Sequence, residues 1–336
     1  MRTGFGSSRS ARADGSGAVS GPGSFGDRLS ECVMRRESQI VLGLDPDPAL
    51  LWPRALELVG GADVASAPPA VRAARAVEAH CALLIDAVAE QCVAVKPQLA
   101  CFERLGAPGW SALVSVVRRA REAGLLVIAD AKRGDIDRSA RAYAQAFLGS
   151  TPSPFGAIAG LGADAMTVSP WLGQDSLVAF VEVARAAAAG LFVLVRNSNP
   201  GAGRLQDREL AGGSVSALVA GFVTELGSAA VGSSGLSDIG AVVGATAPDQ
   251  LARLRKLMPH AVMLLPGVGP QGGRVADLAP AFGPGRAGGI IAASRAIADA
   301  HRLTRGDPAT AARREAARLR EAAWALSDLR ASRLGA

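Results

Sequence analysis

The sequence has little of what several common kinds of site require. Its 336 residues include only three histidines, widely spaced, which disfavours a histidine metal site and a Ser-His catalytic triad. The four cysteines form no Cys-x-x-Cys pair. We interpret them as reduced residues of the core and expect a reducing compartment, the cytoplasm.

The sequence also lacks any run of 18 or more apolar residues, so we expect no transmembrane helix and no membrane partner. Residues 1–26 are rich in Gly and Ser, hold three arginines against one acid, and lack the apolar middle of a secretory signal. This composition predicts a disordered extension, with a transit peptide as the alternative. We expect residues 27–336 to form one folded domain.

Aromatic residues are scarce as well, at 4% of the chain with a single tyrosine. The net charge of +6 comes from the two ends, because residues 1–26 contribute +2 and residues 300–336 contribute +4. A surface that binds nucleic acid usually combines a basic patch with aromatic residues. We therefore expect no nucleic-acid partner.

Eight short apolar runs have the character of buried strands. They are Ile40–Leu44, Val93–Val95, Leu125–Ala129, Ala165–Val168, Leu191–Val195, Ile239–Val243, Ala261–Leu265 and Gly289–Ala293. Most gaps between them hold Ala-, Leu- and Arg-rich segments with helical spacing, such as 74–88 and 312–326. This alternation predicts an α/β fold, and eight such units predict a (β/α)₈ TIM barrel.

The alternative is a doubly wound open sheet. The first strand is followed by Leu44-Asp45-Pro46, where a dinucleotide-binding fold would have G-x-G-x-x-G. Polar residues also follow most strand ends: Asp45, Lys96, Asp130, Lys132, Ser169, residues 196–199, Gln271 and Arg295. In a barrel these all open onto one face, where active sites lie, so the convergence favours the barrel. Asp45 could alternatively be a helix N-cap.

The most informative stretch is residues 127–136, where an apolar run ends in Asp130-Ala-Lys132-Arg-Gly-Asp135. Side chains alternate along a strand, so Asp130 and Lys132 should point the same way. Lysines are rare, three against 33 arginines, yet Lys96 and Lys132 both end apolar runs. Because desolvated lysine can release a proton, this pattern predicts proton-transfer chemistry.

Two further segments predict a phosphate site. The glycine-rich residues 266–273 follow the seventh strand, and Ser294-Arg295 follow the eighth. Glycine N–H groups can approach an anion, a helix beginning near Ser294 offers its positive end, and Arg295 can bind phosphate oxygens with two donors. The loop at residues 197–203 could hydrogen-bond a polar heterocycle or be an ordinary turn.

Together these motifs resemble orotidine 5′-phosphate decarboxylase in its longer bacterial form. The similarity spans roughly residues 38–300 and comprises six motifs in order: Gly-Leu-Asp45-Pro, Val-Lys96-Pro-Gln, Asp130-x-Lys132-x-x-Asp135, Asn-Ser198-Asn-Pro-Gly, Pro-Gly-Val-Gly-x-Gln271-Gly-Gly and Ser294-Arg295. The resemblance implies a barrel lyase without metal or cofactor. Such an enzyme converts orotidine 5′-phosphate to UMP and CO₂ in pyrimidine biosynthesis and works as a homodimer.

The resemblance also implies four catalytic residues. Lys132 would protonate C6 of the pyrimidine, and Asp130 would lie beside the departing carboxylate. Asp135 would reach into the partner subunit's site. Lys96, together with Asp45, would contact the ribose and hold the charged groups in place.

The implied substrate-binding residues continue this set. Ser198 would bind the pyrimidine, while Gln271 and Arg295 would bind the phosphate near Ser294. Residues 137 and 138 carry charges where the family has small residues, but Ser139 keeps a hydroxyl that could reach a phosphate in the partner subunit's site.

Two other functions fit part of the pattern. A sister barrel enzyme acting on sugar phosphates shares Asp-x-Lys-x-x-Asp, but typically needs magnesium and has an acid where Lys96 stands. A non-catalytic phosphate-binding protein, with the basic ends as its interaction surface, is the third hypothesis.

Overall fold

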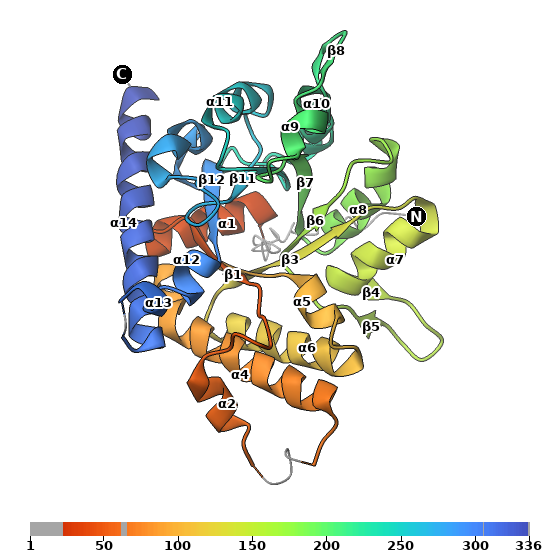
Figure 1. Cartoon of the computed structure of the whole chain (residues 1–336). Coiled ribbons are helices and arrows are strands. Elements are labelled where there is room, and N and C mark those ends of the chain that lie inside the picture. Colours follow the sequence, from red (N-terminus) through yellow and green to blue (C-terminus); the bar gives the residue numbers. More distant parts are fainter. Residues whose placement is uncertain (1–22, 62–65, 305, 335–336) are drawn as a thin grey trace, which may run out of the picture.

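Eight parallel strands close into a barrel in the order β1-β12-β11-β10-β7-β6-β3-β2 (Figure 1). The computed structural model describes residues 23–61, 66–304 and 306–334. The barrel strands are β1 (Ile40–Leu44), β2 (Ala94–Pro97), β3 (Leu126–Arg133), β6 (Ala165–Val168), β7 (Gly190–Arg196), β10 (Ile239–Val243), β11 (Met263–Pro266) and β12 (Gly289–Ala293). The predicted barrel is confirmed, and the open sheet is wrong because β1 pairs with both β2 and β12.

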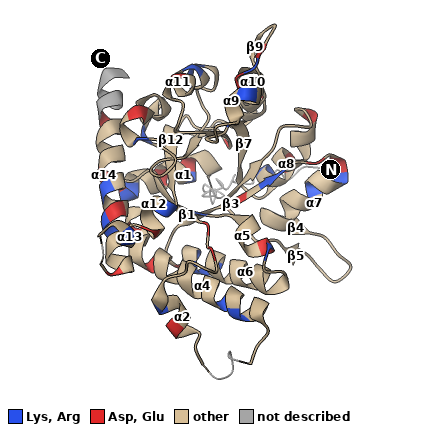
Figure 2. Ribbon diagram, viewed as in Figure 1, with Lys and Arg blue, Asp and Glu red and all other residues tan. Residues whose placement is uncertain are grey.

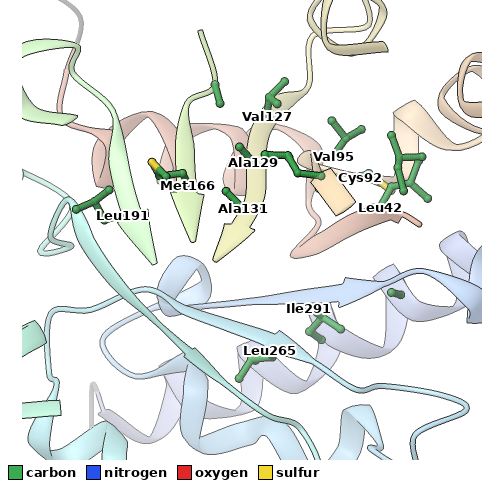
Figure 3. Packing of buried hydrophobic residues seen from close by; sticks show 14 of the residues in the cluster. Leu42, Cys92, Val95, Val127, Ala129, Ala131, Met166, Leu191, Leu265 and Ile291 are labelled. Atoms are coloured by element: carbon green, nitrogen blue, oxygen red, sulfur yellow. The ribbon is translucent and has the colours of Figure 1, made fainter. Parts of the chain in front are cut away.

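The strands are mostly apolar because they are buried on both faces, and most of their charged residues lie at or near their carboxyl ends. Alternate residues, such as Val41, Ile128 and Phe192, point into the barrel and form one core cluster. Their neighbours along the strands form the larger cluster between the strands and the surrounding helices. Figure 3 shows part of this outer layer, with Leu42, Val127, Met166 and Ile291 among its members.

Helices surround the barrel and connect its strands (Figure 1). The longer ones are α1 (Phe25–Arg36), α4 (Pro69–Val88), α6 (Ala107–Glu122), α7 (Asp137–Phe147), α8 (Asp175–Ala186), α10 (Val215–Gly227), α11 (Pro248–Leu257) and α14 (Pro308–Leu334). The shorter ones are α2 (Pro53–Leu58), α5 (Leu99–Glu103), α9 (Ala202–Gln206), α12 (Arg295–Ala298) and α13 (His301–Thr304). The helical spacing seen at 74–88 and 312–326 thus falls within α4 and α14, as predicted.

Short elements fill the remaining connections. In the described part of the chain, four are 3₁₀ helices: η1 (Ala89–Gln91), η2 (Ser228–Ala230), η3 (Val275–Phe282) and η4 (Arg286–Gly288). Two are antiparallel hairpins, β4 (Ser150–Thr151) with β5 (Ile158–Ala159) and β8 (Glu209–Leu210) with β9 (Gly213–Ser214). The sequence patterns predicted none of these short elements.

Helix α1 packs against the amino-terminal end of β7. Its first residue, Phe25, is buried, and its ring meets Phe192 edge-on at a centroid distance of 5.8 Å. A Cβ atom at Gly190 would lie 2.3 Å from the Phe25 ring, so only glycine allows this contact. The helix begins before residue 27, where the folded domain was predicted to start; residues 1–22 of the predicted extension lie outside the described residues.

The cysteines lie in or beside the core, as expected. Cys32, Cys81 and Cys92 are buried, Cys101 is half-buried, and all four are unpaired. Figure 2 shows charges of both signs along α14, where Arg318 pairs with Glu315 at 2.6 Å. Among the described helices, none is both long and apolar enough to cross a membrane.

Candidate active site

The Asp130 carboxylate lies at the centre of the site and accepts four hydrogen bonds. Lys96 Nζ lies 2.5 Å from Oδ2 and Gln98 Nε2 lies 3.1 Å from it. Lys132 Nζ lies 2.5 Å from Oδ1, and Thr167 Oγ1 donates to the same oxygen at 3.0 Å. The predicted meeting of Asp130, Lys132 and Lys96 at the strand ends is therefore confirmed.

Strand β3 brings Asp130 and Lys132 together by departing from regular geometry. Its register against β6 shifts between Ala129 and Arg133, and Lys132 has a positive φ of 49°. A non-glycine residue rarely adopts this left-handed conformation. Simple alternation correctly predicted that the two side chains meet, but it did not predict the break in the strand.

The three central charges stabilise one another. Burial would lower the pKa of the Lys96 ammonium, but the attraction of Asp130 and Asp45 outweighs burial and raises it. Burial would raise the pKa of Asp130, yet Lys96 and Lys132 hold it well below the usual range of an aspartate. Both Lys96 and Asp130 therefore stay charged near neutral pH.

These groups line a cavity of about 280 Å³ at the carboxyl ends of the strands. Its polar lining comprises Asp45, Lys96, Gln98, Asp130, Lys132, Thr167, Asn197, Ser198, Asn199 and Gln271. Its apolar lining comprises Leu194, Val242, Leu264 and Pro266. The cavity lining thus combines charged side chains with apolar residues of the barrel interior, such as Val242 and Leu264.

The loops after β7 and β11 meet over this cavity. Ser198 Oγ donates to Gln271 Oε1 at 2.8 Å. Gly267 has a φ of 105°, and a Cβ atom there would come within 3.0 Å of Ser198, so glycine allows the two loops to approach. Of the two readings of the 197–203 loop, its position on the cavity favours the binding role.

Ser294 and Arg295 line a second, neighbouring cavity of about 240 Å³, which shares Asp45 with the first. Ser294 directly precedes α12, so a helix does begin there as predicted. Gly43 brings it close to β1, since a Cβ atom at Gly43 would lie 2.7 Å from the Ser294 Cβ. Gln271, in contrast, lines only the first cavity among the two.

Asp135 and Ser139 do not join the cluster within their own chain. Asp135 Oδ1 accepts a hydrogen bond from the N–H of the next residue, Ile136, at 2.8 Å. Ser139 is exposed in the first turns of α7. Neither lines the two cavities, so within one chain they remain apart from the other predicted residues.

Two residues with direct contacts to Asp130 were not singled out from the sequence. Gln98 stands two residues after Lys96 and ends the same motif, Val-Lys96-Pro-Gln. Thr167 is the one hydroxyl residue in the apolar run Ala165–Val168, which is the only signal that could have pointed to it. Both come from strands adjacent to β3 or from their ends.

Two other sequence-based readings are corrected. Arg196 was grouped with the polar residues at the strand ends, but it is buried and forms an ion pair with Asp207 at 2.9 Å. The N-cap alternative for Asp45 is wrong, because the residue at the N-cap of α2 is Trp52. Across the described residues, no three His, Cys, Asp or Glu side chains gather as a metal site would require.

Comparison with known proteins gives a consistent result. The model of the orotidine 5′-phosphate decarboxylase / HUMPS family matches residues 38–314. An orotidine 5′-phosphate decarboxylase of Rhodopirellula baltica is 44% identical over 83% of this chain and 89% of its own. One from Deinococcus radiodurans is 38% identical over 88% of this chain and 96% of its own.

A solved structure agrees with these sequence relatives. Leishmania donovani OMP decarboxylase superimposes with a TM-score of 0.63 and is 32% identical. The alignment covers 90% of this chain and 99% of the other.

Proposed function

The chain belongs to the orotidine 5′-phosphate decarboxylase / HUMPS family, and from that premise we propose how its residues perform the reaction. It is a carboxy-lyase that converts orotidine 5′-phosphate to UMP and CO₂ in pyrimidine biosynthesis, as relatives of that name at 44% and 38% identity indicate. The proposed mechanism rests on one observation: the Asp130 carboxylate forms ion pairs with both Lys96 and Lys132.

The two lysines take different roles. Lys96 is 7% exposed, is fixed on Asp130, and has a raised pKa because the attraction of nearby carboxylates outweighs its burial, so it keeps its proton. The Lys132 side chain is 45% exposed and lines the cavity, so its ammonium can reach a bound substrate. Lys132 is accordingly the proton donor, and Lys96 is a fixed positive charge.

The reaction then needs one bond cleavage and one proton transfer. The bond between C6 and the carboxylate breaks, CO₂ leaves, and the electron pair stays on C6. Lys132 transfers a proton from Nζ to C6, and the neutral amine regains a proton from solvent. A positive charge held next to the developing carbanion stabilises the transition state more than the ground state, which is what accelerates a reaction.

The apolar part of the cavity strengthens this effect. Leu194, Val242 and Leu264 lie on the same cavity as the charges. Electrostatic attraction grows as the local dielectric falls, so a charge beside this surface acts more strongly than one in water. Uncharged CO₂ also suits an apolar surface better than the carboxylate that it replaces.

Asp130 holds the array and does not itself transfer a proton. Its four donors and its depressed pKa, which Lys96 and Lys132 keep low against the effect of burial, keep it ionised. In the substrate complex its negative charge lies near the substrate carboxylate, which is also negative. Because both lysine ammonium groups contact its carboxylate, we assign Asp130 the positioning of the two lysines.

The substrate is oriented by groups at the cavity rim. Asp45 and Lys96 contact the ribose, and Ser198 binds the pyrimidine. Gln271 on the first cavity and Arg295 on the second, which share Asp45 in their lining, bind the phosphate. Binding at a remote phosphate supplies energy that positions the ring for reaction.

A homodimer completes the site. Asp135 and Ser139 stand away from their own cavity, and the exposed apolar side chains Ile136 and Tyr143 belong to the same segment, just before and within α7. Exposed apolar side chains of this kind are typical of a contact with another chain. A second copy packed there brings Asp135 into the partner's site and Ser139 towards its phosphate.

The activity is tested by following the loss of orotidylate absorbance with the purified chain. We expect turnover that a chelator does not change, because the chain's own lysines supply the positive charge. Chelator-sensitive turnover of a keto-sugar phosphate, with none of orotidylate, would instead identify the sugar-phosphate enzyme.

A further inference from the structure

The hydroxyl of Thr167 connects the two central residues of the site. Its Oγ1 donates to Asp130 Oδ1 at 3.0 Å and accepts a hydrogen bond from the backbone N–H of Lys132 at 2.9 Å. Thr167 is 1% exposed and lies on the neighbouring strand β6. The buried Thr167 oxygen thus contacts both the Asp130 carboxylate, which binds the Lys132 ammonium, and the backbone N–H of Lys132 itself.

This contact lies where β3 departs from the regular ladder. Between the pairs Ala129–Met166 and Arg133–Val168, three residues of β3 stand opposite one residue of β6, which is Thr167. The extra residues leave the Lys132 N–H without its regular place in the ladder, and the Thr167 hydroxyl supplies its acceptor. Buried N–H groups require such a partner.

The backbone conformation of Lys132 also depends on its hydrogen bond to Thr167. A non-glycine residue at a φ of 49° is strained and persists only when its surroundings hold it there. Threonine suits that task because its branched side chain has few χ1 rotamers, so the position of its oxygen is set by the strand. The lysines on the same carboxylate have long, flexible side chains and cannot fix it in that way.

We propose that Thr167 is a positioning residue that sets the geometry of Asp130 and Lys132 for decarboxylation. This inference rests on the roles proposed above for those two residues. Without the hydroxyl, the Lys132 N–H loses its acceptor and Asp130 Oδ1 loses one of its donors, and the lysine ammonium shifts relative to C6. The phosphate-binding residues lie elsewhere on the rim, so substrate binding should persist.

The test compares Thr167→Val, which replaces the hydroxyl with a methyl group in a side chain of the same shape, with Thr167→Ser, which retains the hydroxyl. We expect Thr167→Val to lower kcat by roughly 10- to 100-fold, the loss typical of misplaced reacting groups. The KM should stay within about threefold of the original, because ground-state binding is unchanged. Thr167→Ser should restore most of kcat. Thr224→Val is the matched control, since its hydroxyl donates to Leu257 O on the outer helices.

Two outcomes would overturn the inference: a Thr167→Val enzyme whose kcat is unchanged, or equal losses in the Val and Ser variants, which would assign the effect to packing. If Thr167→Val does not fold, Thr167→Ala and Thr167→Ser replace it, because they differ only by the hydroxyl. The variant Lys132→Ala distinguishes a failure of the proposed mechanism from a failure of the role proposed for Thr167. Normal turnover in that variant would refute the mechanism, whereas its inactivity beside a fully active Thr167→Val would refute only the role of Thr167.

Discussion

Lys132 Nζ lies 2.5 Å from Asp130 Oδ1, although the two residues stand on the same strand and are separated by only one residue. Their exposure differs sharply: 45% of the lysine side chain is accessible, against 7% of the aspartate. The aspartate is held by other donors, whereas the lysine ammonium can leave it. We therefore infer that, when substrate binds, Lys132 turns towards C6 while Asp130 keeps its place.

The first prediction concerns Lys132. Lys132→Ala should lower kcat by on the order of 10⁴-fold or more, because it removes both the proton donor and a charge beside the carbanion. Lys132→Arg should also be severely impaired, since arginine keeps the charge but does not release a proton. Binding of UMP, measured by calorimetry, should persist in both variants.

The third lysine of the chain is the control for this experiment. Lys256, on α11, is exposed, and Lys256→Ala should leave kcat and UMP binding unchanged. An active Lys132→Ala enzyme would contradict the assignment of the proton donor. Loss of UMP binding would contradict the separation of phosphate binding from chemistry.

The second prediction tests whether Asp135 acts in the partner's site. Lys132→Ala and Asp135→Asn should each be inactive alone, and mixing them with subunit exchange should restore activity. A heterodimer then has one site with both changes and one with neither. Random assortment in a two-fold dimer should restore about a quarter of the sites.

Recovery depends on the site being shared between chains. If Asp135 acted within its own chain, every site of the heterodimer would carry one change, and mixing would restore nothing. Sedimentation analysis of each variant verifies that both still form dimers. A mixture of dimeric, inactive variants that regains no activity would rule out the shared site.

The third prediction concerns the phosphate. Arg295→Ala should raise KM for orotidylate by about 10- to 100-fold, because a charge-assisted hydrogen bond contributes about 1.5–3 kcal/mol. Its kcat should fall too, since phosphate binding helps to position the ring. Arg302 is a nearby control, because it pairs with Asp299 at 3.2 Å, and Arg302→Ala should change neither constant. Equal KM values in the two variants would contradict phosphate binding by Arg295.

The sequence was sufficient to predict the barrel because burial on both faces makes its strands apolar. Ile239–Val243 illustrates this, with all five residues buried. The short hairpin of β4 and β5 left no such pattern, since its strands are exposed and only two residues long. A pattern of burial therefore predicts the core elements and misses those that lie on the surface.

The site could be predicted only in part for a related reason. Charged residues at strand ends stand out against apolar runs, so Lys96 and Lys132 were found. The same rule also selected Arg196, whose charge is used in a structural ion pair with Asp207. Thr167 was missed because its role depends on a break in β3 that no residue type signals.

The fourth prediction concerns stability at acid pH and His80. The ring is 6% exposed, its Nδ1 accepts a hydrogen bond from Trp52 N at 3.1 Å, and burial together with the charge of His301 lowers its pKa from 6.5 to about 4. Below pH 6.5 the His80 ring binds a proton in the unfolded chain, whereas in the folded chain it binds one only below about pH 4. The free energy of unfolding should therefore fall as pH drops through this window, by on the order of 3 kcal/mol.

His80→Gln isolates this contribution, because glutamine offers an acceptor to Trp52 N but does not titrate in this range. Denaturant unfolding at pH 7 and pH 4.5 should give a smaller loss of stability on acidification in His80→Gln than in the original chain. Acidic groups titrate equally in both proteins, so they cancel in the comparison. His260 is exposed, and His260→Gln should keep the full pH dependence. If the His80 and His260 variants lost the same stability between the two pH values, the acid sensitivity would have to come from the carboxylates alone.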